Sequence, residues 1–154
     1  MTSTSGQGAA PLPDALSGHA GYLAVLLGQR AQREFEAAIL PLDLKPSAYD
    51  FLATVDELGA LSQRELADVL GIDAARVVAM TDQLEARGLV SRTVDPADRR
   101  RNQIALTRAG RALTAKVRRI ADRVETELLG PLSHAERVTL RSLMRRVLGL
   151  DRTA

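Results

Sequence analysis

Residues 62–73 read Ser-Gln-Arg-Glu-Leu-Ala-Asp-Val-Leu-Gly-Ile-Asp, and this stretch decides the fold. Ser62 and Glu65 form a capping-box pattern, which starts a helix because the hydroxyl and the carboxylate satisfy free backbone N–H groups. Gly71 is suited to the left-handed conformation that ends this helix, and Asp73 is suited to capping the next one. Two helices joined by so tight a turn predict a helix-turn-helix. Its predicted inner faces consist of Leu66, Ala67, Leu70, Ile72, Val77 and Leu84.

The residues after this motif predict a β-hairpin with a charged tip. Apolar and polar side chains mix over residues 89–94 and again around Ile104 and Leu106, whereas residues 95–101 are mostly charged. Alternation of this kind is typical of half-buried strands. A hairpin next to a helix-turn-helix predicts a wing.

Longer helices are predicted on both sides of this lobe. Before it, apolar residues recur mostly three or four positions apart over residues 19–40, and a second helix is expected over residues 46–59. After it, Thr107 is expected to cap a long helix with nearly coiled-coil spacing, and Ser133 opens a last helix with a capping box. The last helix is expected to bury Leu140, Leu143, Val147 and Leu148.

The composition agrees with a mostly α protein. Aromatic residues make up 3% of the chain, so the core must be aliphatic, and there is no cysteine to form a disulfide or a thiolate metal site. The longest purely apolar run, residues 22–27, is far shorter than the roughly 20 residues that span a bilayer. We therefore expect a cytoplasmic protein with no membrane partner.

The charge is distributed unevenly along the chain. Residues 1–86 carry 5 Lys or Arg and 12 Asp or Glu, whereas residues 87–154 carry 16 and 7. A basic second half is compatible with a surface that contacts phosphates, and equally with helices of opposite charge that pair in a dimer. The charge distribution alone leaves both interpretations open.

Base-reading residues are expected at the start of the second helix of the motif. Arg76 is the long hydrogen-bond donor there, and arginine recognises guanine through its O6 and N7 acceptors. The alternative is an ion pair of Arg76 with Asp73 or Glu65 on a solvated face. At the start of the first helix, Gln63 and Arg64 are candidates for phosphate contacts, and Ser62 has a capping role that needs no DNA.

The hairpin tip carries three successive arginines, Arg99, Arg100 and Arg101, preceded by Asp98. Arginine side chains enter the narrow, electronegative minor groove of DNA, and Asp98 is placed to hold one of them. A solvated charge cluster is the alternative for an arbitrary loop. Next to a helix-turn-helix, a DNA-binding wing is favoured.

Three phrases resemble the multiple antibiotic resistance regulator (MarR) family of winged helix-turn-helix transcriptional regulators. They are Gln-Leu-Glu-Ala-Arg-Gly-Leu-Val-Ser-Arg at residues 83–92, Asp-Pro-Ala-Asp-Arg-Arg at 95–100 and Ile-Ala-Leu-Thr-Arg-Ala-Gly at 104–110. The resemblance implies that Asp98 and Arg100 are paired wing residues. It also implies a homodimer on a palindromic double-stranded operator. Ala74 and Ala75 stand where polar DNA-contacting residues are common in the family.

The predicted organisation has four parts: a disordered tail over residues 1–15, an N-terminal dimerisation helix over 16–44, a winged helix-turn-helix DNA-binding lobe over 45–107 and C-terminal dimerisation helices over 108–150. The helices outside the lobe carry apolar faces that a lone lobe could not cover. The fold class is therefore mostly α, with a two-stranded β-hairpin wing and a helical dimerisation base.

The resemblance also implies a small aromatic or phenolic effector that releases DNA from a repressor. Tyr22, Arg30, Tyr49 and Asp50 are the candidates for its site, although core or surface roles are the commoner fate of such residues.

An enzyme is not expected. The two histidines, His19 and His134, have no spacing typical of a metal pair or a catalytic triad, and we expect no metal or cofactor. The rival hypothesis is a dimeric helical protein-interaction module whose winged lobe binds protein. Steep salt dependence and preference for one DNA sequence would separate the two.

Overall fold

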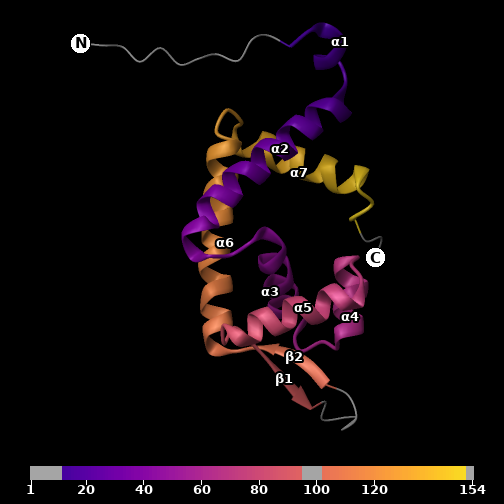
Figure 1. Cartoon of the computed structure of the whole chain (residues 1–154). Helices are drawn as coiled ribbons and strands as arrows, with labels where there is room; N and C mark the ends of the chain where they lie inside the picture. The colour runs from indigo at the N-terminus through magenta and orange to yellow at the C-terminus, as the bar shows by residue number, and fades with distance from the viewer. Residues whose placement is uncertain (1–11, 95–101, 152–154) are drawn as a thin grey trace, which may run out of the picture.

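A computed structural model of the chain describes residues 12–94 and 102–151, which form helices around one β-hairpin (Figure 1). The elements in chain order are α1 Asp14–Ser17, α2 Ala20–Ile39, the 3₁₀ turn η1 Leu40–Leu42, α3 Pro46–Leu58, α4 Gln63–Leu70, α5 Ala74–Ala86, β1 Val90–Val94, β2 Asn102–Leu106, α6 Arg108–Leu128 and α7 His134–Val147. The predicted mostly α, winged helix-turn-helix fold is confirmed.

The winged lobe consists of α3, α4, α5 and the hairpin, and it lies beside the first half of α6 (Figure 1). Its core is aliphatic apart from one aromatic ring, as the composition predicted. The largest buried side chains of the lobe and of the adjoining part of α6 are Phe51, Leu52, Leu66, Val77, Thr81, Val90, Ile104, Thr114 and Val117. Every element of the lobe thus contributes to one core.

Local capping interactions produce the helix-turn-helix. The Ser62 hydroxyl accepts the Glu65 amide at 3.3 Å, and the Glu65 carboxylate accepts the Ser62 amide at 2.8 Å. Gly71 ends α4 with φ 64°, a conformation that side chains with a Cβ disfavour. The Asp73 carboxylate then accepts the Arg76 amide at 2.8 Å and starts α5. All three features are as predicted.

A compact junction joins α5, the wing and α6. The Thr107 amide donates to the Leu89 carbonyl at 3.0 Å, and the Thr107 hydroxyl donates to the Gly88 carbonyl at 2.7 Å. The same hydroxyl accepts the Gly110 amide at 3.0 Å. A Cβ on Gly110 would lie 2.0 Å from the Leu89 oxygen, so only glycine permits this approach. The two ends of the wing are therefore held together at the start of α6.

The wing has one feature that the sequence did not predict. Strands β1 and β2 pair antiparallel, with Val90 opposite Leu106, and Leu61 forms a further bridge to Ile104. The two residues exchange backbone hydrogen bonds of 3.1 and 2.7 Å. The loop between α3 and α4 is thereby attached to the hairpin.

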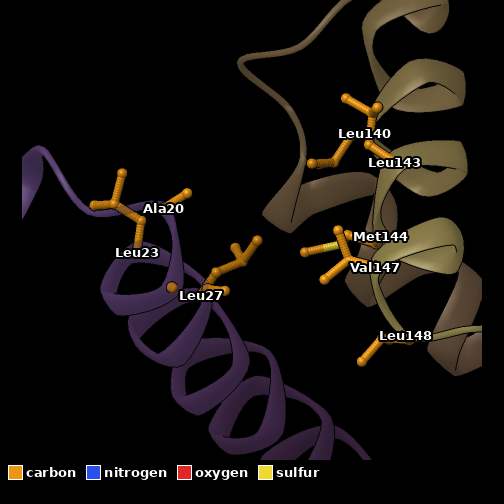
Figure 2. Close-up of a pocket in the computed structure, with 10 residues that line it drawn as sticks. Ala20, Leu23, Leu27, Leu140, Leu143, Met144, Val147 and Leu148 are labelled. Atoms are coloured by element: carbon orange, nitrogen blue, oxygen red, sulfur yellow. The ribbon is translucent and has the colours of Figure 1, made fainter.

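Helix α2 packs against α6, and α2 and α7 both lie at the end of the molecule away from the wing (Figure 1). The prediction that α7 buries Leu140, Leu143, Val147 and Leu148 is wrong for the single chain, because no residue of α7 is buried and Val147 is 87% exposed. The reason is that α2 and α7 are separated by an apolar groove of about 590 Å³. Figure 2 shows Leu23 and Leu27 of α2 facing the side chains of α7 across it.

Two short elements are absent from the sequence-based expectation. Helix α1 starts at Asp14, inside the predicted tail of residues 1–15, of which residues 1–11 lie outside the described part. The turn η1 follows α2 and ends at Asp43, the one non-glycine residue with positive φ (49°) in the described ranges. Over residues 12–94 and 102–151, no helix is long and apolar enough to cross a membrane.

Candidate nucleic-acid interface

Helix α5 exposes a face of small side chains. Val77, Thr81 and Leu84 are buried on its inner side, where the Thr81 hydroxyl donates to the Val77 carbonyl at 2.7 Å. The helical repeat of 3.6 residues places Ala75 and Ala79 on the opposite, exposed side. The predicted DNA-contacting residues Ala74 and Ala75 are both exposed at the start of this helix.

Arg76 is exposed at the edge of that face, about 100° around the helix axis from Ala75. Its backbone amide is bound by Asp73, but its side chain makes no hydrogen bond or ion pair with any described residue. The alternative in which the guanidinium pairs with Asp73 or Glu65 is therefore not observed in this part of the chain. A guanidinium that has no partner in residues 12–94 and 102–151 is available there to a base or a phosphate.

The start of α4 lies next to α5 in the motif. Arg64 is exposed and Gln63 is half-buried, whereas the Ser62 hydroxyl is used in the capping box. The structural part of the Ser62 prediction is confirmed, and its contact with phosphate stays a prediction. The first-turn N–H groups and Arg64 together give this end of α4 a positive potential.

The predicted wing-tip residues Asp98, Arg99, Arg100 and Arg101 lie outside the described residues. The described strands position the base of the wing through Arg92 on β1. Its amide donates to Glu85 Oε1 at 3.0 Å, and its guanidinium donates to Glu85 Oε2 and to Asp82 Oδ1. One side chain thus connects the wing to two successive turns of α5.

The Arg92 cluster also sets the local charge. The side-chain hydrogen bond to Asp82, with a smaller contribution from Glu85, raises the pKa of Arg92 above its usual range. The protonated guanidinium offsets the negative charge that Asp82 places on the exposed side of α5.

Arg87 holds the other end of α5. Its guanidinium donates to the Asp43 carbonyl at 2.6 Å and to the Leu42 carbonyl at 3.2 Å, at the corner after η1. Carbonyls at the end of a helical turn lack internal partners, and a cation there is stabilising. The end of the recognition helix is thereby attached to the chain that leaves α2.

The four candidate effector residues do not come together at one described cavity. Arg30 makes an ion pair with Glu34 at 2.7 Å on exposed α2, and Tyr22 is 37% exposed on the same helix. Tyr49 packs against the ring of Phe35, with centroids 5.6 Å apart. Asp50 follows it on α3, where desolvation raises the pKa of its carboxyl. None of the four lines the apolar groove between α2 and α7 or any of three smaller pockets in the described part of the chain.

Three residues of this surface were not among the site predictions. Val78 is 37% exposed beside the alanines of α5, and Arg87 and Arg92 position the helix. A signal for Arg92 was present, because it follows buried Val90 by two positions and therefore shares its strand face. An arginine on an inward face needs carboxylate partners, which Asp82 and Glu85 supply.

Comparison with known proteins places this geometry in one family. A model of the MarR family matches residues 42–101. The transcriptional regulator HosA of Escherichia coli O111:H- is 32% identical over 106 residues, which cover 69% of this chain and 78% of HosA. The structure of the transcriptional repressor CouR bound to a 23-mer DNA duplex is similar with a TM-score of 0.78 and 33% identity, covering 90% of this chain and 99% of that one.

A further similar structure concerns regulation of DNA binding of Bordetella bronchiseptica BpsR by 6-hydroxynicotinic acid. Its TM-score is 0.73 and its identity 30%, over 90% of this chain and 97% of BpsR. These similarities extend well beyond the helix-turn-helix and include the helices on both sides of it.

The Arg92 cluster generates a testable prediction. Arg92→Ala removes the contacts to Asp82 and Glu85, so we expect the free energy of unfolding to fall by about 1 kcal/mol, a value limited by the partial exposure of all three side chains. Arg92→Lys keeps the charge but reaches only one carboxylate well, and should lose about half as much. Urea titration measures both.

Arg119→Ala is the matched control, since Arg119 is exposed on α6 and has no side-chain partner among the described residues. Its free energy of unfolding should lie within about 0.5 kcal/mol of that of the parent protein. Equal midpoints for Arg92→Ala and Arg119→Ala would show that the cluster does not stabilise the wing.

Proposed function

The chain belongs to the MarR family of transcriptional regulators, and from this we propose that it is a homodimeric repressor that binds a palindromic DNA operator. The observation that carries the proposal is the exposed recognition helix α5, with Arg76 at its edge and no partner for its guanidinium among the described residues. The likeness to CouR, whose structure contains a DNA duplex, supports it. Its proposed place of action is the cytoplasm, where bacterial DNA lies.

In the proposed complex α5 enters the major groove. Arg76 reads a guanine edge, Ala74 and Ala75 allow the helix backbone to approach the bases, and Arg64 with Gln63 contacts the phosphates. The wing-tip arginines, oriented by Asp98, are assigned to the adjacent minor groove. Residues 45–107 would form the DNA-binding lobe, and residues 16–44 and 108–150 the dimerisation base.

The homodimer is supported by the apolar surface of that base. The groove between α2 and α7 is lined almost entirely by aliphatic side chains, and further large apolar residues are exposed on the same helices. Burial of apolar surface contributes about 25 cal/mol per Å², so a second copy that covers this groove would favourably remove apolar surface from water. Two lobes related by a two-fold axis match a palindrome.

A small aromatic effector is the finer part of the proposal. Its support is the likeness to BpsR, in which 6-hydroxynicotinic acid regulates DNA binding. The aromatic pair Phe35 and Tyr49 lies where α2 approaches α3, next to Asp50. A ligand bound between the base and the lobe would alter the position of the lobe.

The DNA-binding proposal predicts selective retention of a palindromic duplex from a random library, with half-sites about 10 base pairs apart and steep salt dependence. Arg76→Ala should weaken the selected complex by about 1–3 kcal/mol and relax preference at one base position per half-site. Arg146→Ala on α7, exposed and without a side-chain partner among the described residues, is the control. Retention of no duplex over random DNA would favour the protein-interaction module instead.

The homodimer predicts a mass twice that of the 16.6 kDa chain by light scattering at micromolar concentration. Val147→Asp places a charge in the groove and should shift the population toward monomer. Val138→Asp is the matched control, because Val138 is also exposed on α7 but lies about two and a half turns away, on the opposite side of the helix. If the two variants have equal masses, the groove is not part of the dimer interface.

The effector proposal predicts that 6-hydroxynicotinate, used as the probe, weakens the DNA complex about 5- to 150-fold. Arg30→Ala should reduce this response while DNA affinity without the probe is unchanged, and Arg33→Ala on the same helix should have neither effect. If the probe binds, as calorimetry would show, and DNA affinity stays constant, this compound is not an effector.

A further inference from the structure

In the first half of α5, residues 74–79, the exposed face carries no hydrogen-bonding side chain other than Arg76 at its edge. Ala75 and Ala79 lie on the side opposite the buried Val77, Thr81 and Leu84, and the exposed Val78 adjoins them at the edge of the face nearer to Thr81. Val78 is 37% exposed, although valine is usually buried in a helix of this kind. We refer to Ala75, Val78 and Ala79 as the apolar triplet.

The polar residues around the triplet lie at its ends or at its edge. Gln83 is exposed one turn after Ala79, toward the C-terminal end of the helix. Asp82, one turn beyond Val78, is bonded to the Arg92 guanidinium and is held toward the wing. Asp73, at the start of the helix, accepts the Arg76 amide. Arg76 projects from the edge of the face, where it reaches beside the triplet and not across it. A base pair under the triplet would therefore meet chiefly the methyl groups of alanine and valine.

The chemistry of the major groove limits what this surface fits. Guanine, adenine and cytosine present only acceptors or donors there, whereas thymine also presents its 5-methyl group. Polar base edges covered by alanine and valine would lose water without gaining a hydrogen bond, which is costly. A thymine methyl covered by the same side chains is removed from water favourably.

We propose that the apolar triplet recognises thymine by its 5-methyl group, so that each operator half-site has thymine at the positions under Ala75, Val78 and Ala79. This inference rests on the proposed function, since it places α5 in the major groove of DNA. It adds the class of base that is read, and it names Val78 as a specificity-determining residue.

The test uses the duplex that the protein selects from a random library. Each thymine of the half-sites is replaced in turn by deoxyuridine, which keeps base pairing and the O4 acceptor and removes only the methyl group. We expect affinity to fall about fourfold at a position that contacts the triplet, the value for exposing one buried methyl group. Thymines outside the half-sites should be replaceable without effect.

Variants of the protein separate a direct contact from an effect of the methyl group on DNA shape. Val78→Ala should lower the ratio of thymine to uracil affinity toward one at one position per half-site, while the ratio at other positions is kept. Val138→Ala on α7 is the matched control and should keep every ratio. A melting curve of each variant establishes that it is folded.

The outcomes are distinct. If the protein selects a duplex and complete replacement of its half-site thymines by deoxyuridine leaves affinity unchanged, the thymine inference is overturned and the proposed function stands. Replacement by deoxyuridine could lower the affinity while Val78→Ala leaves every ratio of thymine to uracil affinity unchanged. That result would assign the effect of the methyl group to DNA shape and overturn the proposed contact. If no duplex is retained over random DNA, both the proposed function and this inference fail.

Discussion

The carbonyl of Leu89 and the missing side chain of Gly110 determine how this molecule is assembled. The end of α5, both ends of the wing and the start of α6 meet within a few ångströms there, and the Thr107 amide and hydroxyl bond to consecutive carbonyls of the 88–89 turn. Since α6 also carries the helical base, the junction connects the surface that faces DNA to the surface proposed to face a second copy. Any larger residue at position 110 would force the lobe away from the long helix.

From that junction, the recognition helix is positioned by three polar contacts of different kinds. A carboxylate cap at Asp73 fixes its first turn, the Arg92 cluster connects its middle to the wing, and Arg87 attaches its last turn to the corner after η1. The exposed side is left with small apolar groups in its first half, with Arg76 at one edge and with Gln83 near its end. Since Asp73, Asp82 and Glu85 are used for orientation, the proposed reading of sequence rests on Arg76 and on methyl contacts.

The sequence predicted what depends on neighbours in the chain. The capping box at Ser62, the left-handed Gly71 and the Thr107 cap are local, so the helix boundaries followed to within a residue or two. The Leu61 bridge to Ile104 joins residues distant in the chain and carries no periodic signal. The apolar face of α7 was predicted correctly as a face, but its burial depends on what packs against it. The ligand candidates were chosen by residue type, which does not encode how α2 and α3 approach each other, and the wing tip lies outside the described residues.

The hydrogen bonds from Arg87 to the carbonyls of Leu42 and Asp43 fix the last turn of α5 to the corner after η1, so that the helix can turn about this end. The thirteen residues of this helix extend about 20 Å from that corner, at about 1.5 Å per residue. A rotation of the lobe by about 10° about the corner would carry the far end of α5 through about 3.5 Å, close to the rise of one base pair. A small change in angle where α2 enters the lobe is therefore converted into a change of register on DNA, without any change inside the helix itself.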